Sequence, residues 1–144
     1  MFPAATKEGG TCLGTPDTCN IPAPPPPAGP GGIPTPFPNT GQLNSADKCT
    51  EKVLINKKGA CVEDSEMGSS HGDEAGSSNL PTPKGLMSQK NMGKIVFKTH
   101  SSKVKLEGKG AVTHTASTAH NGDGNPNDPV GTHAVPSQTK VIIG

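Results

Sequence analysis

Residues 103–115, KVKLEGKGAVTHT, indicate the fold class most directly. Val104 and Leu106 alternate with charged side chains, so an extended segment here has one apolar face and one charged face. The run EGKG supplies the glycines of a tight turn, and AVTHT (111–115) is typical of a return strand. The stretch therefore predicts a short antiparallel hairpin that buries one face.

Similar stretches lie on both sides of this hairpin. TEKVLIN (50–56), a Lys-Lys-Gly turn and the return segment ACVED (60–64) predict a second hairpin. KIVFKT (94–99) and QTKVIIG (138–144) predict further strands, whereas at most one helical turn is expected, around Met87–Lys90. The expected core consists of Val53, Ile55, Ile95, Phe97, Val104, Leu106, Val112, Val141 and Ile143. We therefore predict a small all-β domain of short strands and Pro/Gly-rich loops, with little or no helix.

The composition limits the size of the core. The chain has 144 residues, of which 19 are glycine and 16 are proline, and only 29% are hydrophobic, with no tryptophan or tyrosine. This length is enough for one domain, so residues 1–144 are expected to form a single domain. A core with so little apolar area usually needs a disulfide, a metal or a partner surface for stability.

The first 39 residues show no strand pattern. Residues 1–20 are rich in Gly, Thr and Pro and are expected to form a loop. Residues 21–39, IPAPPPPAGPGGIPTPFPN, are expected to be extended polyproline II, because proline fixes φ and has no N–H group. This segment is either a free linker or a stiff strap that Ile33 and Phe37 anchor.

The charge pattern and the N-terminus exclude several classes of protein. Thirteen basic and twelve acidic residues are interspersed, and aromatic residues are scarce, which argues against a nucleic-acid partner. No apolar run reaches 18 residues, so no membrane span is expected. The N-terminus MFPAATKEGG lacks the apolar region of a Sec signal peptide. In a cytoplasm disulfides are disfavoured, so the four cysteines are expected as free thiols or metal ligands.

The segment HGDEAG (71–76) places a histidine, two carboxylates and two glycines within six residues and raises the question of catalysis. Its neighbours are Ser, Gly and Asn, which favour solvated turns. We expect a turn in which Gly72 and Gly76 have unusual φ angles, while Asp73 and Glu74 accept backbone N–H bonds. The alternative is a zinc-dependent hydrolase in which Glu74 or Asp73 is the base.

The cysteines and histidines together indicate a metal. His114 and His120 lie six residues apart across a predicted loop, and Cys12 and Cys19 form a pair seven residues apart. Neither spacing is that of a zinc finger or a zincin. Four cysteines and five histidines in a chain with a small core nevertheless fit one structural zinc better than a catalytic site.

Several stretches, taken together, resemble the PAAR-like proteins (proline-alanine-alanine-arginine repeat-like) that tip the spikes of bacterial contractile injection systems, including type VI secretion. They occur in the order of the family and cover most of the chain. The stretches are TPDTCNIPAPPPP (15–27), IPTPFPN (33–39), KVLINKKGACVEDSEMGSSHGDEAGSS (52–78), KVKLEGKGAVTHTASTAHN (103–121) and VPSQTKVIIG (135–144).

The resemblance implies a small conical β-structure with a broad base and an apex sharpened by zinc. The base would cap a trimeric VgrG-type β-helical spike, with one copy per trimer, so that one chain presents three similar edges. The implied zinc is structural, one per chain, with Cys19, His114 and His120 as ligands. The candidates for a fourth ligand are His71, His100, His133 and Cys12.

The resemblance also implies a location and a role. The chain would stay in the bacterial cytoplasm before firing and then be secreted at the spike tip, carrying effector cargo if cargo binds. Because the sequence stops at Gly144, directly after its last predicted strand, we expect no fused toxin domain and no enzyme. Two alternatives remain, the zinc-dependent hydrolase and a Pro-rich adaptor that binds a partner domain through PAPPPP.

Overall fold

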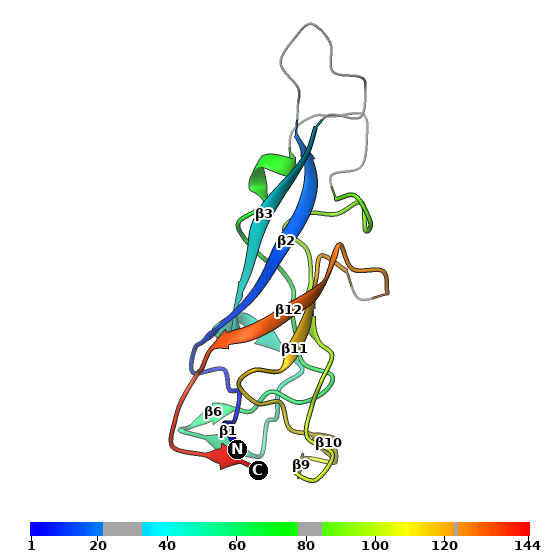
Figure 1. The fold of residues 1–144 in the computed structure, drawn as a ribbon. Coiled ribbons are helices and arrows are strands. Elements are labelled where there is room, and N and C mark those ends of the chain that lie inside the picture. Colours follow the sequence, from blue (N-terminus) through cyan, green and yellow to red (C-terminus); the bar gives the residue numbers. More distant parts are fainter. Residues whose placement is uncertain (22–32, 78–84, 123) are drawn as a thin grey trace, which may run out of the picture.

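The structure, a computed structural model, describes residues 1–21, 33–77, 85–122 and 124–144. It is all-β, as predicted, and tapers from a broad end that holds both termini to a narrow end at the β2–β3 hairpin (Figure 1). Among the described residues, the helical elements are the short 3-10 turns η1 (Leu43–Ser45) and η2 (Glu74–Ser77). The strands are β1 (Phe2–Pro3), β2 (Thr11–Ile21), β3 (Ile33–Gln42), β4 (Ala46–Asp47), β5 (Leu54–Ile55), β6 (Lys58–Gly59), β7 (Glu66–Met67), β8 (Ile95–Phe97), β9 (Lys105–Leu106), β10 (Lys109–Gly110), β11 (Ser117–His120), β12 (Asp128–Val135) and β13 (Ile142–Ile143).

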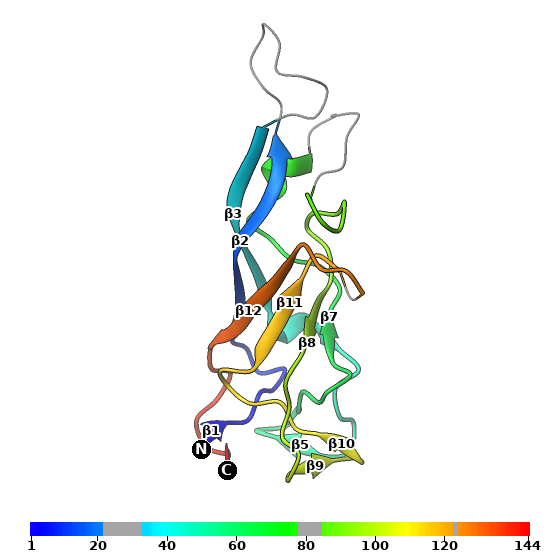
Figure 2. The ribbon, with the colours of Figure 1, turned by 45° about the vertical axis from the view of Figure 1, so that its right-hand side comes forward.

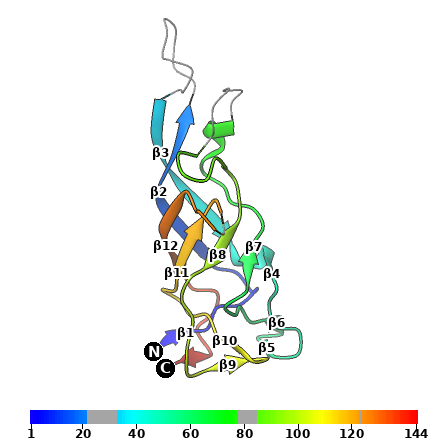
Figure 3. The same ribbon diagram turned by 90° about the vertical axis from the view of Figure 1, so that its right-hand side faces the viewer.

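One seven-stranded antiparallel sheet runs through the molecule in the order β3-β2-β12-β11-β8-β7-β4. Three separate two-stranded sheets, β5–β6, β9–β10 and β1–β13, gather at the broad end, which we call the base (Figure 2). The view in Figure 3 shows the same division, with β2 and β3 extending away from the base.

A hairpin is present within residues 103–115, as predicted, but its return strand is wrong: it is Lys109–Gly110, which the prediction placed in the turn, and not residues 111–115. β9 and β10 are antiparallel, and Glu107 (φ 51°) and Gly108 (φ 83°) form the turn between them. The second predicted hairpin is also present as β5–β6, but its turn lies at Asn56 and Lys57, where φ is 51° and 64°. Positive φ at both central residues matches the right-handed twist of the paired strands, and asparagine and glycine adopt it most readily.

The three base sheets are linked in a cycle by backbone hydrogen bonds. The amide of Ala5 donates to the carbonyl of Val112 (2.8 Å), Val112 donates to Cys61 (3.0 Å), and Cys61 donates back to Ala5 (2.8 Å). A second cycle surrounds the first, with bonds from residues 7, 63 and 114 to the carbonyls of residues 59, 110 and 3. Three chain segments therefore occupy equivalent positions around one axis.

The cycle corresponds to a sequence repeat. KVLINKKGACVE (52–63) and KVKLEGKGAVTH (103–114) align without a gap, and both have Lys, Val, Lys, Gly and Ala at matching positions. The first and last residues of the chain provide the third segment through β1 and β13. In the ring, Ala5, Cys61 and Val112 are equivalent, and all three are fully buried.

The loop predicted for residues 1–20 is wrong, because β2 is the longest strand of the structure. The pattern of buried positions along β2 shifts by one residue at a bulge. Cys12 and Gly14 are buried before the bulge, whereas Asp17 and Cys19 are buried after it. The extra residue between Gly14 and Asp17 moves the inward side from even to odd positions. The bulge therefore turns a carboxylate and a thiol into the interior.

The polyproline II prediction for residues 21–39 is wrong for its second half, where residues 33–39 belong to β3. The part over residues 22–32 lies outside the described residues. β3 is an edge strand, and Pro34, Pro36 and Pro38 occupy its even positions. Alternate residues of a strand direct their N–H groups to the same side, and Thr40, which is in step with these prolines, donates its N–H to His71 O (2.7 Å) on the side away from β2. The prolines therefore lack an N–H group only on the side that does not pair with β2, and an edge strand tolerates this.

Two further strands were not expected. His120 lies on β11 instead of in a loop, and the loop predicted over 121–129 ends early because β12 begins at Asp128. β12 bonds to both β2 and β11, with Gly131 and His133 on its buried side. Because glycine and histidine occupy these buried positions, the sequence of β12 does not alternate between apolar and polar residues, and the strand could not be predicted from such a pattern.

The predicted core is correct in most positions. Ile55, Ile95, Phe97, Val112 and Ile143 are buried, and Ile95 and Phe97 share the inner face of β8. Val53, Val104 and Leu106 are only half-buried, and Val141 is 40% exposed, so this last assignment is wrong. The core also contains the fully buried residues Leu43, Met67, Cys12 and Cys61.

Candidate metal centre and polar network

Two carboxylates and one thiol meet in the interior between the base and the narrow end. Asp17 and Cys19 come from β2 after the bulge, and Asp73 directly precedes η2, which packs beside β2. Ligand atoms of these three residues lie within 4.8 Å of one another, and all three side chains are fully buried. In the part of the chain that the structure describes, this is the cluster with the spacing of a metal site.

Two asparagine side chains hold the carboxylates. Asn121 Nδ2 donates to both Asp17 and Asp73, and Asn127 Nδ2 donates to Asp17. The amide orientation follows from backbone contacts, because Asn121 Oδ1 accepts the N–H of Gly93 (2.6 Å) and Asn127 Oδ1 accepts that of Met87 (2.8 Å). The amide nitrogens must therefore face the acids.

Burial controls the protonation of this cluster. Burial raises the pKa of Asp17 to about 6, opposed by the Asn127 hydrogen bond and reinforced by the neighbouring Asp73. Burial, together with the charges of Asp17 and Asp73, also raises the pKa of the Cys19 thiol to about 12. Negative charges concentrated in a buried site favour either a bound proton or a bound cation.

The donor set fits a divalent cation. Carboxylate oxygens and a thiolate are ligands of zinc, and a cation would supply the positive charge that deprotonated Asp17, Cys19 and Asp73 lack. A bound divalent metal would offset two of the three negative charges of the deprotonated cluster and join β2 to the segment before η2. That contribution is structural: it ties two distant parts of the chain together.

His120 is the centre of an adjoining polar network. Its Nδ1 lies 2.7 Å from Asn39 Oδ1, and its Nε2 lies 2.9 Å from Thr118 Oγ1. Asn39 Nδ2 donates to Ser70 Oγ (2.9 Å), so Asn39 Oδ1 must accept, and His120 must carry its proton on Nδ1. Thr118 then donates to Nε2. Burial lowers the pKa of His120 to about 4, so the ring is neutral near pH 7.

Two glycines make room for this ring. A Cβ on Gly131 would lie 2.5 Å from His120 Nε2 and 2.5 Å from Thr118 Oγ1. A Cβ on Gly14 would lie 2.8 Å from His120 Cγ and 2.5 Å from Asp128 Oδ2. The imidazole is therefore enclosed by backbone on β2 and β12, which explains why glycine interrupts both strands.

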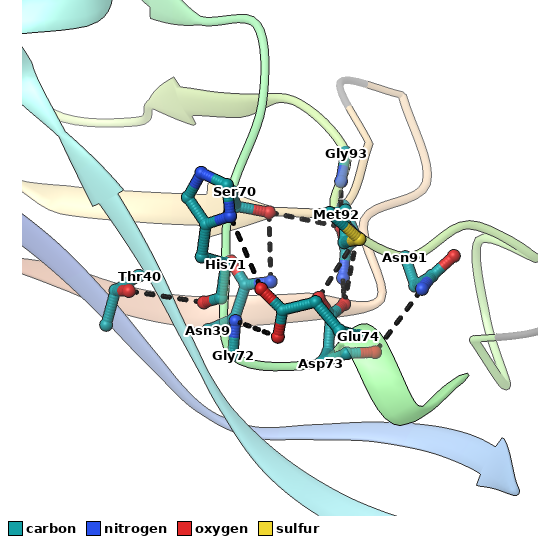
Figure 4. Close-up of polar contacts among 11 residues, drawn as sticks. Asn39, Thr40, Ser70, His71, Gly72, Asp73, Glu74, Asn91, Met92 and Gly93 are labelled. Atoms are coloured by element: carbon teal, nitrogen blue, oxygen red, sulfur yellow. Dashed lines mark hydrogen bonds and ion pairs between the residues drawn. The ribbon is translucent and has the colours of Figure 1, made fainter. Parts of the chain in front are cut away.

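HGDEAG (71–76) forms the predicted turn (Figure 4). Gly72 has φ 120°, and its N–H donates to Glu74 Oε2 (2.8 Å). Asp73 accepts the N–H of Met92 at 3.0 and 3.1 Å. These parts of the prediction are confirmed, whereas Gly76 lies within η2. Asp73 thus combines its role in the turn with membership of the buried cluster, which the sequence did not indicate.

The structure does not bring the three predicted zinc ligands into one cluster. Cys19 lies with Asp17 and Asp73, whereas His120 bonds to Asn39 and Thr118. His114 is half-buried, and its Nε2 lies 3.0 Å from Ala134 O. The set Cys19, His114 and His120 stays a prediction.

The candidates for a fourth ligand are scattered. His71 and His100 are exposed and lie next to glutamates, at 3.3 Å from Glu74 and 3.1 Å from Glu63. His133 is buried against His114, with ring centroids 5.6 Å apart, and its Nε2 has no hydrogen-bond partner among the described residues. Cys12 is fully buried, and burial raises the pKa of its thiol to about 12.

Asp17 and Asp73 were not among the predicted ligands. A signal for Asp17 was present, since Pro-Asp-x-Cys places a carboxylate two residues before Cys19. Two residues apart on a strand share one face, so both side chains can reach one site. No local signal joins Asp73, Asn121 and Asn127 to them, because these residues meet only through the tertiary fold.

Comparison with known proteins identifies the chain as a PAAR-like domain. Residues 10–127 match the model of the toxin PAAR-like domain, and the chain belongs to this family. A curated relative, the DNase toxin Tse7 of Pseudomonas aeruginosa, is 36% identical over 115 residues. The match covers 79% of this chain but 29% of the relative, so the chain spans less than a third of that protein's length. No solved structure matches the chain.

The comparisons confirm the resemblance and correct one expectation. The expectation that the chain is not an enzyme is wrong, because the family is a family of toxin domains and its relative is a DNase toxin. The absence of a nucleic-acid partner stays a prediction. The described helices are also too short to cross a lipid bilayer.

Proposed function

We propose that this chain docks on the blunt end of a trimeric VgrG-type spike, one copy per trimer, and delivers a toxin of which it forms all or part. The observation that carries this proposal is the cyclic hydrogen bonding of the base, Ala5 to Val112 to Cys61 and back to Ala5. A single chain with three equivalent segments can make the same contact with each of three identical subunits.

The base offers both strand edges and apolar contacts for such docking. Each sheet of the base has only two strands, and edge strands are the sites at which another chain can add by backbone pairing, as at the open end of a β-helical trimer. Apolar side chains project from this end: Met1 is 90% exposed, Leu54 54%, and Phe2 and Ile142 46% each. Large apolar side chains at an exposed end are typical of a protein–protein contact.

The tapered shape supports a role in penetration. β2 and β3 extend from the base as a paired ribbon of 11 and 10 residues, and the alternating prolines of β3 restrict its backbone. A narrow, stiff end opposite a docking face suits a part that leads a spike through an envelope. Secretion with the spike, from a cytoplasmic origin, follows from this role.

We also propose a structural zinc, one per chain, bound by Cys19 together with Asp17 and Asp73. The fully buried position of the cluster and the presence of two carboxylates beside a thiol support a cation there. A metal that joins β2 to the segment before η2 would stiffen the narrow half. His114 and His120 remain predicted ligands that a metal analysis of single variants can test.

The relative supports a DNA-degrading activity for the toxin that this chain delivers. That protein is a DNase toxin, and the match spans 115 residues, 29% of its length. A nuclease assay on the complete native effector, with plasmid DNA as substrate, tests this part of the proposal. Intact plasmid after incubation with divalent cations would contradict it.

Docking is tested by replacing exposed base residues. Leu54→Glu combined with Ile142→Glu should abolish copurification with the VgrG-type spike of the native source, because charges would enter an apolar contact. The matched control is Val130→Glu on β12, 79% exposed and outside the base, which should copurify as the wild type does. Equal recovery of the base variant and the control would refute docking through the base.

A further inference from the structure

Two of the four cysteines form a close pair that neither docking nor the metal cluster uses. The Sγ atoms of Cys49 and Cys61 lie 3.7 Å apart, and both are free thiols. Cys61 is fully buried in the ring of the base, whereas Cys49 is partly exposed. One member of the pair can therefore meet a reagent from solvent while the other stays shielded.

The backbone around the pair is already held together. Thr50 donates its N–H to Ala60 O (2.9 Å), and Ala60 donates its N–H to Thr50 Oγ1 (2.8 Å). These contacts fix the residues next to Cys49 and Cys61 side by side. Joining the two sulfur atoms would therefore close the loop that contains β5 and β6 without moving distant segments.

The two thiols differ in pKa: the partly exposed Cys49 is the more acidic and the buried Cys61 the less acidic, as expected for an attacking and a resolving cysteine. The hydrogen bond from Cys61 lowers the pKa of Cys49 to about 7, against the effect of burial. The same bond and burial raise the pKa of Cys61 well above its usual value. Cys12 and Cys19, in contrast, have thiol pKa values raised to about 12 by burial. Cys49 is thus the cysteine in which a lowered thiol pKa and partial exposure to solvent occur together, as the attacking thiol of such a pair requires.

We propose that Cys49 and Cys61 are an oxidation site that forms an intramolecular disulfide on reaction with a small-molecule disulfide of the glutathione type. The Cys49 thiolate attacks one sulfur of the reagent, its S–S bond breaks, and one thiolate leaves. Cys61 then attacks Cys49 Sγ, releases the second thiolate and gives up its proton to it. The pair loses two electrons and two protons, and the reagent becomes two thiols.

The surroundings of Cys49 suit an anionic reagent. Cys49 lines an open surface pocket with Lys48, Lys52 and Lys109 and with Glu51 and Glu107. Glu107 is engaged by the backbone N–H groups of residues 51 and 52, and Lys48 and Lys109 lie 3.0 Å from Glu66 and 2.8 Å from Asp64. The three lysines outnumber the two glutamates of the pocket, which favours a reagent with carboxylate groups. A protein that leaves a reducing cytoplasm for an oxidising compartment would close this bond after secretion.

The test is oxidation of the reduced, purified full chain with graded ratios of oxidised to reduced glutathione. Peptide mapping should find a Cys49–Cys61 link first, with a mass lower by two hydrogens, while Cys12 and Cys19 remain alkylatable after denaturation. Oxidation should raise Tm by about 5 °C or more, and dithiothreitol should reverse the rise. Oxidation of Cys12 or Cys19 first, or dimers linked through Cys49, would overturn the proposal.

Cys49→Ser is the matched control, since it keeps a small polar side chain at a partly exposed position. It should show no internal disulfide and no rise in Tm under the same oxidation. An unchanged rise in this variant would also overturn the proposal. Should the variant fail to fold, the peptide map of the wild type still decides, because it identifies the linked residues directly.

Discussion

Acidification should destabilise the protein through one side chain, His120. The ring is fully buried, carries its proton on Nδ1 and accepts a hydrogen bond at Nε2. Its pKa is about 4 in the folded chain, against the usual 6.5. Because the unfolded chain binds this proton more tightly, the free energy of unfolding falls as pH decreases from 6.5 to 4. The pKa difference corresponds to a loss of about 3 kcal/mol.

The assay is urea denaturation of the wild type and of His120→Gln between pH 4 and pH 7. Glutamine can donate to Asn39 and accept from Thr118 but does not titrate, so the difference between the two curves isolates His120. Asp17, whose raised pKa of about 6 has the opposite effect on stability, contributes equally to both proteins. Parallel stability profiles, or a His120 titration midpoint near 6.5 by NMR, would refute the reasoning.

Two further predictions concern the glycine beside this ring and the metal. Gly131→Ala should lower the free energy of unfolding by about 1–3 kcal/mol, because its Cβ would overlap His120, whereas Gly68→Ala, with open space around its Cβ, should stay within about 0.5 kcal/mol of wild type. Equal urea midpoints would contradict this. Elemental analysis should find one zinc per chain, lost in Asp17→Asn and retained in the exposed control Asp64→Asn. Zinc retained in Asp17→Asn would remove Asp17 from the ligand set.

The hairpins of the base could be predicted from the sequence because their information is local. Val104 and Leu106 alternate with lysines, and the turn residues follow directly, so a few neighbouring residues specify the structure. β3 could not be predicted in this way. Its prolines argue against a strand, and they are accommodated only because β3 lies at the edge of the sheet.

The buried cluster of Asp17, Cys19 and Asp73 could be predicted from the sequence only in part. The family resemblance implied Cys19 as a ligand, and the structure places this thiol in a cluster of metal-site spacing. The sequence did not indicate Asp73 as a partner, because 54 residues separate the two and their meeting depends on the bulge in β2. The threefold base was present as the repeat of residues 52–63 and 103–114, but its third copy is divided between β1 and β13.

The most direct test of the account is the stoichiometry of the complex with the native VgrG-type spike, measured by native mass spectrometry. A base with three equivalent segments on one chain predicts one copy of this protein for each spike trimer, with no further copies added at excess protein. Three copies per trimer would contradict the account, because each subunit would then bind a chain of its own.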